Sequence, residues 1–187
     1  MKHFLLACTF LYFSTGSSMA QPKIPALDRS PLDISYYPNN YPLQKIQDKA
    51  TEPMLARVIY SRPQKSGRVI FGDLIEYGKV WRLGANEATE IEFYQNVKIN
   101  NSKVKKGRYT LYAIPWPDKW TIILNSETDT WGSFKYDEQK DKLRVDIPVE
   151  KQLDIAESFV IFFDKTSNGF SLQILWDDIK TGLPISL

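Results

Sequence analysis

Short runs of alternating apolar and polar residues recur along the chain from about residue 55 onward. The clearest run is 143–149, where Leu143, Val145, Ile147 and Val149 share one face and polar or charged residues occupy most of the other. A period of two is typical of a β-strand with one buried face. The pattern predicts strands at 55–61, 68–71, 80–82, 89–93, 97–99, 108–114, 120–124, 143–149, 157–163 and 170–176.

Turn residues separate these segments, and no long helical period lies between them. Asn100 and Asn101 tolerate positive backbone dihedrals and predict a hairpin. The segments 108–114 and 120–124 are apolar on both faces, as central strands are, and the polar stretch 126–142 predicts a long loop with a helical turn at its end. We therefore predict an all-β fold, a single-domain antiparallel β-sandwich of the jelly-roll kind over residues 54–187.

The chain before this domain has a different character. Residues 21–53 contain six prolines, which disfavour a helix or a central strand and predict a proline-rich extended arm. Residues 1–20 combine a basic start, an apolar run and small residues before Ala20, which predicts a signal peptide cleaved after Ala20. We expect a secreted or periplasmic protein rather than a lipoprotein attached at Cys8, because cleavage there would split the apolar run.

Removal of the signal peptide would take with it the only cysteine and the only histidine of the chain. Such a chain has no disulfide, no Ser-His-Asp or Cys-His nucleophile, and no zinc or haem site that depends on these ligands. Oxygen-ligand metals stay chemically possible, but Asp118, Glu127, Asp129 and Asp137 do not have the spacing of an EF-hand calcium loop. We predict no metal and no cofactor.

The charge and hydropathy of the chain limit the classes of partner that it can bind. The formal net charge is +2, and no dense basic segment suggests nucleic acid. No apolar segment is long enough to span a bilayer. We therefore expect neither nucleic acid nor a membrane span.

Polar residues gather at 82–90, between two apolar runs. Arg82, Asn86, Glu87, Thr89 and Glu90 lie within nine residues of one another. The planar fork of an arginine holds a carboxylate, a phosphate or a pair of sugar hydroxyls, and amide and carboxylate groups add donors and acceptors. We predict a pocket in which Arg82, Asn86, Glu87 and Thr89 bind a small polar molecule or a glycan.

Two other interpretations of this cluster stay open. Glu87 with Glu90 or Asp73 could form the carboxylate pair of a glycoside hydrolase, one as acid and the other as base or nucleophile. Alternatively, Arg82 could pair with Glu87 or Glu90 and brace a chain reversal, in which case the cluster has a purely structural role.

Tryptophan residues suggest a sugar-binding surface as well. Trp116, Trp120 and Trp131 could form an apolar platform on which a sugar ring stacks, so Trp116 is included among the predicted ligand-binding residues. Large aromatic residues also close small cores, and we expect Trp120 and Trp176 to do so.

Three segments resemble a known family. Residues 68–89, 106–115 and 120–125 are similar to the secreted bacterial family called domain of unknown function 2911. The resemblance extends over roughly the whole chain after the signal peptide, as one domain. It implies no mechanism, because the family is defined without one.

Overall fold

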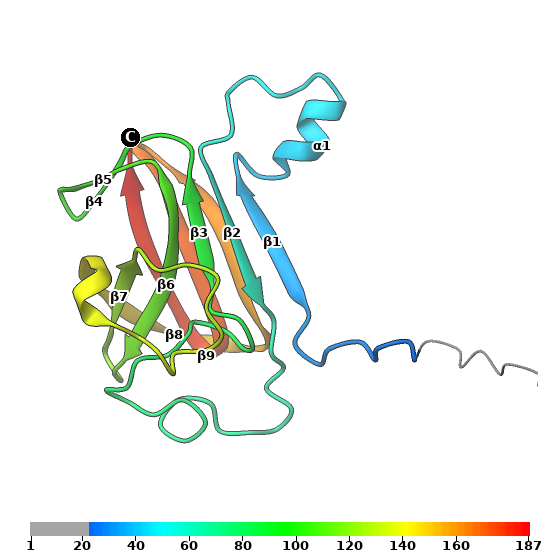
Figure 1. Ribbon diagram of the computed structural model, residues 1–187, viewed down its shortest axis with the longest axis vertical. Helices are drawn as coiled ribbons and strands as arrows, with labels where there is room; N and C mark the ends of the chain where they lie inside the picture. Colours follow the sequence, from blue (N-terminus) through cyan, green and yellow to red (C-terminus); the bar gives the residue numbers. More distant parts are fainter. Residues whose placement is uncertain (1–22) are drawn as a thin grey trace, which may run out of the picture.

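A computed structural model describes residues 23–187; the predicted signal peptide lies outside the described residues. Nine antiparallel strands form one continuous sheet in the order β1-β2-β3-β6-β7-β8-β9-β4-β5 (Figure 1). The fold is all-β, as predicted, and the described residues include one short α-helix and one 3-10 turn. The elements are β1 (Leu32–Tyr37), α1 (Tyr41–Ile46), β2 (Ala56–Ser61), β3 (Glu90–Phe93), β4 (Val97–Ile99), β5 (Ser102–Val104), β6 (Gly107–Pro115), β7 (Lys119–Asn125), η1 (Glu138–Lys140), β8 (Asp141–Thr166) and β9 (Gly169–Ser186).

The sheet becomes a sandwich because β8 and β9 are long and bent. The first part of β8 pairs with β7, and the remainder, from Val149 onward, pairs with β9 with register shifts on both sides of Ala156. Such irregularities bend a strand and increase its twist. The second part of β8 therefore returns over β1 and β2: the Ser35 hydroxyl donates to the Ile161 carbonyl at 2.7 Å, and the rings of Tyr60 and Phe159 lie 5.9 Å apart.

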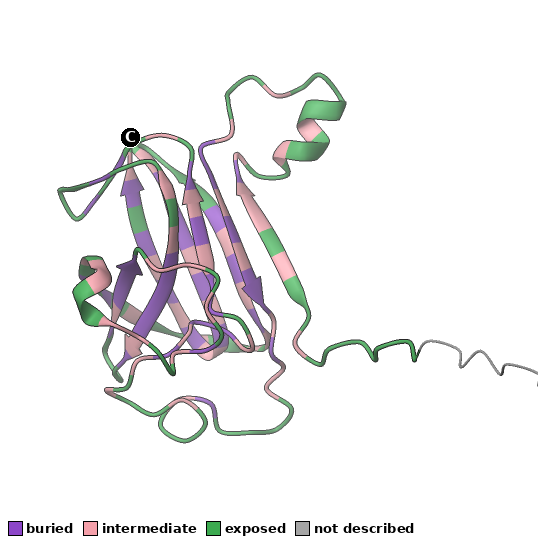
Figure 2. Ribbon diagram, viewed as in Figure 1, coloured by how far each residue is buried: buried purple, intermediate pink, exposed green. Residues whose placement is uncertain are grey.

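Aromatic side chains fill the space between the two layers. Trp81 lies at the centre of this cluster, with its ring 5.7 Å from Trp120, 5.4 Å from Phe159 and 6.1 Å from Trp176. Trp120 and Trp176 are both buried, as predicted for core residues. Buried positions follow the inner faces of the strands, whereas loops and turns are largely exposed (Figure 2).

Most of the predicted strands are confirmed, but two are wrong. Residues 68–71 lie in a bent loop, and residues 80–82 contribute a single bridge between Trp81 and Ala113 rather than a strand. Both segments belong to the long connection between β2 and β3, where apolar residues are buried by the core without a partner strand. The predicted hairpin is present between β4 and β5, with φ values of 46° at Asn100 and 62° at Asn101.

The proline-rich segment 21–53 contains more regular structure than its composition suggested. Strand β1 lies at an edge of the sheet, where flanking prolines remove no ladder hydrogen bond. The expectation that the segment holds no helix is wrong, because α1 begins at Tyr41 with Pro42 in its first turn. Proline is tolerated there because the first N–H groups of a helix have no intrahelical acceptor.

Candidate ligand-binding site

The site is built on the residues that follow Trp81 in the connection between β2 and β3. Trp81 is fixed to β6 by two backbone hydrogen bonds with Ala113, at 2.7 and 2.9 Å. Its indole Nε1 also donates to the Gly84 carbonyl at 3.0 Å. The chain therefore leaves the core at Arg82 from a rigid starting point.

A tight turn after Arg82 depends on unusual backbone conformations. Leu83 and Asn86 have φ values of 53° and 55°, and Gly84 has a φ of 153°. A Cβ at Gly84 would lie 3.2 Å from the Ser61 carbonyl oxygen, so the turn packs directly on β2. Thr89 closes it: its N–H donates to the Arg82 carbonyl at 3.1 Å and its hydroxyl donates to the Leu83 carbonyl.

Thr89 was predicted to bind the ligand, but these two bonds hold it inside the turn. Its side chain is fully buried, and its hydroxyl is occupied by a backbone carbonyl. The structure gives Thr89 a role in positioning Arg82.

A second loop lies against this turn. The N–H of Gly132 donates to the Asn86 carbonyl at 2.9 Å, and the Ser133 hydroxyl donates to the Val80 carbonyl at 3.0 Å. A Cβ at Gly132 would lie 2.7 Å from the Phe134 ring and 3.4 Å from Nη1 of Arg82. Gly132 therefore allows the second loop to approach Arg82 closely.

The two loops and β9 enclose the first cavity, of about 590 Å³. Arg82 and Asn86 lie in its wall, as the sequence predicted for a shared pocket. Ser133, Phe134 and Trp176 were not predicted to line a site. The only sequence signal for Ser133 and Phe134 is that the segment 131–134 interrupts the polar stretch 126–142. The lining residues are Ser30, Pro63, Arg68, Leu74, Ile75, Glu76, Lys79, Val80, Trp81, Arg82, Gly84, Ala85, Asn86, Ser133, Phe134 and Trp176.

Arg82 differs from most other arginines of the described chain in its surroundings. Arg57, Arg62, Arg108 and Arg144 each lie within 4 Å of a carboxylate, whereas no ion pair within residues 23–187 includes Arg82. Its Nε is buried without a hydrogen-bond partner among these residues. Burial without a counter-charge lowers the pKa of the Arg82 guanidinium from its usual value.

The ion pair expected for a structural brace is therefore excluded, because Arg82 forms no ion pair with Glu87 or Glu90. Glu90 is instead engaged on both sides: its Oε2 lies 3.4 Å from Nη1 of Arg108, and its Oε1 accepts from the Asp129 N–H. Arg108 in turn pairs with the Asp129 carboxylate.

Glu87 and Glu90 line a second cavity, of about 390 Å³. Trp131 forms part of its wall with 60% of its surface exposed. An antiparallel bridge between Glu87 and Trp131 fixes the two residues side by side. The predicted ligand-binding residues are therefore divided, with Arg82 and Asn86 in the first cavity and Glu87 in the second.

The remaining predicted residues lie apart from both walls. Asp73 is exposed in the turn between Phe71 and Ile75. Trp116 is partly exposed, and its ring packs on the backbone of Gly78, where an added Cβ would lie only 2.9 Å from it. Trp120 belongs to the core, so the three tryptophans do not form one platform.

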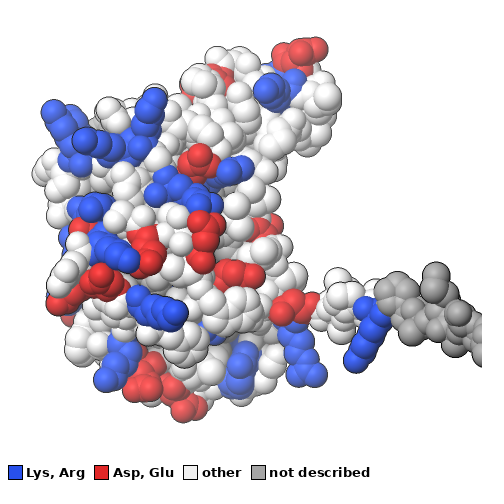
Figure 3. All heavy atoms as spheres, viewed as in Figure 1, with Lys and Arg blue, Asp and Glu red and all other residues white. Residues whose placement is uncertain are grey.

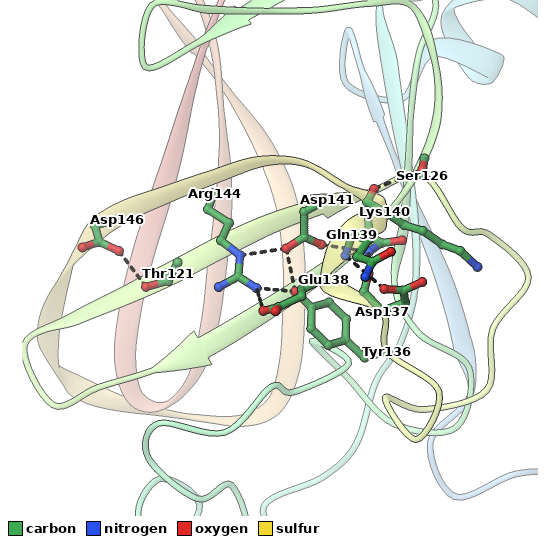
Figure 4. Close-up of polar contacts among 11 residues, drawn as sticks. Thr121, Ser126, Tyr136, Asp137, Glu138, Gln139, Lys140, Asp141, Arg144 and Asp146 are labelled. Carbon is green, nitrogen blue, oxygen red and sulfur yellow. Dashed lines mark hydrogen bonds and ion pairs between the residues drawn. The ribbon is translucent and has the colours of Figure 1, made fainter.

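A polar cluster that the sequence did not indicate lies beside η1 (Figure 4). The Tyr136 hydroxyl donates to the Asp141 carboxylate at 2.6 Å and accepts from Nη2 of Arg144 at 2.6 Å. Burial and the hydrogen bond to Asp141 raise the pKa of Tyr136 to about 12. With Arg144 also bonded to Asp141 at 2.7 Å, the cluster closes on itself and fastens the 126–140 loop to β8.

Charged side chains of both signs are interspersed over the face in Figure 3, with cations grouped over the β4–β5 hairpin. Within residues 23–187, no three histidine, cysteine, aspartate or glutamate side chains are gathered closely enough to hold a metal ion. No helix in the same range is both long and apolar enough to cross a bilayer.

A sequence model of one family, described as Protein of unknown function (DUF2911), matches residues 42–185. The chain belongs to this family. The match extends from α1 to the end of β9 and thus includes both cavities and all the residues that line them except Ser30 and Leu32. No curated protein and no solved structure matches the chain.

Proposed function

We propose that this member of the family binds a small polar ligand, such as a sugar or a related metabolite, in the first cavity, with Arg82 as its anchor. The observation that carries the proposal is the Arg82 side chain, whose Nε is buried without an acceptor in the wall of a cavity of about 590 Å³. Buried polar groups are normally hydrogen-bonded, and each exception requires an explanation. Nε itself is closed off from solvent, but the terminal nitrogens of the same guanidinium also have no hydrogen bond or ion pair within residues 23–187, and a bound ligand would supply their acceptor.

The cavity has the volume of a small-molecule site. Such sites have volumes of roughly 300–1,000 Å³ and combine an apolar wall with a few polar groups that orient the ligand. Here the exposed side chains of Leu74 and Phe134 supply apolar surface, and Arg82 and Asn86 supply polar groups.

A thermal-shift screen of sugars and metabolites on the purified protein, followed by calorimetry on the hits, tests this proposal. Arg82→Ala should abolish binding and leave the melting temperature within a few degrees of the parent, because no hydrogen bond or ion pair with residues 23–187 depends on the Arg82 side chain.

Arg108→Ala is the matched control, since Arg108 lines the second cavity and pairs with Glu90 and Asp129. It should leave ligand affinity unchanged. If Arg108→Ala abolishes binding and Arg82→Ala does not, the ligand occupies the second cavity and the assignment to the first is wrong.

A second candidate function, carboxylate-dependent hydrolysis, is favoured by one observation: Glu87 and Glu90 line the same cavity beside the exposed ring of Trp131. The engagement of both Glu90 oxygens leaves Glu87 as the residue to test. Glu87→Gln should retain binding and lose activity on a glycan or ester panel. Equal activity of Glu87→Gln and the parent would exclude this function.

We also propose that the protein is exported from the cytoplasm, on the strength of the basic, apolar and small-residue pattern of residues 1–20. N-terminal sequencing of the exported protein should begin at Gln21. A mature protein that still begins at Met1 would contradict this.

A further inference from the structure

We propose that the ligand of the first cavity is a small organic anion, whose carboxylate or phosphate is bound by Arg82 and whose body rests on the apolar side chains of the wall. This inference rests on the proposed function and specifies its ligand class. Three independent features of the cavity carry it: the charges in its wall, the kind of hydrogen-bonding groups that have no partner, and the shape of the apolar surface beside them.

The charge of the wall is predominantly positive. Arg68, Lys79 and Arg82 line the cavity, against the single carboxylate of Glu76. None of these three cations takes part in an ion pair within the described part of the chain, although such pairs are frequent elsewhere on the surface. The guanidinium of Arg68 donates to the carbonyls of residues 64 and 65, which holds it in place and leaves its charge without a counter-ion.

One further carboxylate lies nearby and does not cancel this charge. Asp28 accepts a hydrogen bond from Nδ2 of Asn86 at 2.9 Å and another from the Ser30 N–H at 2.6 Å. Asp28 is exposed and is bonded to Asn86 and Ser30 rather than to any of the three cations. The contact uses one of the two N–H groups on Nδ2 of Asn86 and leaves the three cations without a counter-charge.

The groups without partners are donors. Three buried side-chain polar atoms within residues 23–187 have no hydrogen-bond partner, and two of them, Nε of Arg82 and Nε1 of Trp176, belong to side chains that line this cavity. Trp176 is only 1% exposed, and an indole N–H can only donate. Both atoms are closed off from solvent, so a ligand would bond instead to the terminal nitrogens of Arg82, which have no hydrogen bond or ion pair within residues 23–187. A guanidinium can only donate, and an anionic oxygen is the strongest acceptor for it.

The apolar part of the wall indicates the size of the ligand body. Leu74 and Phe134 line the cavity and are 44% and 83% exposed, whereas Trp81 and Trp176 are almost fully buried. A cavity of about 590 Å³ accommodates a body the size of one ring on this apolar surface. The ligand class is therefore a sugar acid, a sugar phosphate or a comparable ring-bearing carboxylate.

Calorimetry with ligand pairs that differ in charge tests the inference. The pairs are galactose and galacturonate, glucose and glucose 6-phosphate, and benzamide and benzoate, so that each anion has a neutral counterpart with the same ring. In at least one pair the anion should bind about tenfold or more tightly than its counterpart, since a hydrogen bond to a charged group is stronger than one to a neutral group. The first two pairs also distinguish a carboxylate from a phosphate.

Variants then assign the preference to Arg82. Arg82→Ala should remove the difference between the two members of the pair, and Arg82→Lys should keep part of it, because lysine retains the charge but loses the planar fork. Arg57→Ala, which removes an arginine paired with Glu92 at 2.8 Å, is the matched control and should leave the preference unchanged. Binding should also alter the fluorescence of the tryptophans in the wall, which gives a readout that does not depend on stability.

The outcomes separate the two proposals. If a neutral sugar binds at least as tightly as its anion, and Arg82→Ala weakens both members equally, the ligand class is wrong and the proposed function stands. If the anion preference survives in Arg82→Ala, the assignment to Arg82 is wrong. If no member of any pair binds, the inference is overturned, and a negative result in the wider metabolite screen would overturn the proposed function as well.

Discussion

Thr89 offers the sharpest test of how the first cavity is built. Its hydroxyl donates to the carbonyl of Leu83, and its N–H donates to the carbonyl of Arg82. Thr89→Val replaces the hydroxyl with a methyl group of nearly the same size. The substitution therefore keeps the packing and the backbone hydrogen bond, and it removes one donor from a residue that holds Leu83 at a φ of 53°.

The expected cost follows from the burial of the site. Thr89 and Leu83 are both 0% exposed, so the abandoned carbonyl has no route to bulk water. A buried acceptor without a partner costs about 1–3 kcal/mol, and we take about 2 kcal/mol for this one. In a chain of 150–250 residues that loss corresponds to a decrease in melting temperature of about 4–8 °C.

Thr181→Val provides the control, because Thr181 is 2% exposed and its hydroxyl donates to the Pro148 carbonyl at 2.7 Å. Both variants should lose similar stability in calorimetry and chemical denaturation. Only Thr89→Val should speed amide exchange at Thr89 and Gly132, whose N–H groups bond to the turn, and only it should weaken ligand binding. A Thr89→Val protein that melts within about 1 °C of the parent, with unchanged exchange at Gly132, would refute the reasoning.

Two further predictions follow from local geometry. Gly132→Ala should lower stability by about 1–3 kcal/mol, because φ is 68° and the new Cβ would lie 2.7 Å from the Phe134 ring. It should also weaken ligand binding. Gly67→Ala is the control: its φ is 71° and nothing lies within 4 Å of the new Cβ, so it should lower stability without affecting binding. Tyr136 has a folded-state pKa of about 12 against 10.0 for the free side chain, so the native state holds this proton more tightly, and its contribution to stability is present below pH 10 and lost between about pH 10 and 12. Denaturation across that range should show a smaller alkaline loss for Tyr136→Phe than for the parent, and equal slopes would contradict the shift.

The strands could be predicted from sequence where local pattern and turn chemistry agree. Residues 143–149 alternate cleanly, and the Asn100-Asn101 pair accepts positive φ, so both were recognised without knowledge of their neighbours. The sequence did not reveal that segments 143–149 and 157–163 belong to the single strand β8. Lys151 interrupts the apolar series that ends at Val149, and the alternation at 152–155 places Leu153 and Ile155 in solvent in an irregular segment. Only the pairing with β9 reveals the continuity.

For the candidate site as well, local sequence predicts some of the residues and long-range packing determines the others. Arg82 and Asn86 line one cavity because a turn of five residues brings them together, and their nearness in the sequence was enough to group them. Glu87 was assigned to the same pocket, but it follows the left-handed residue Asn86 and bridges Trp131, so its side chain enters the second cavity. Trp176 lies ninety-odd residues away in the chain and reaches the first cavity only through the packing of β9, which no local pattern encodes.

The loop at 130–134 connects the two cavities, and this connection determines which variants can assign a ligand to either one. Trp131 lines the second cavity, Phe134 lines the first, and Gly132 between them is bonded to Asn86. A substitution at Trp131 or Phe134 that displaces the loop would therefore disturb both walls, and its effect on binding would not identify the occupied cavity. Arg82 and Arg108 each belong to one wall and lie outside this loop, so the contrast between their alanine variants separates the two cavities where loop variants do not.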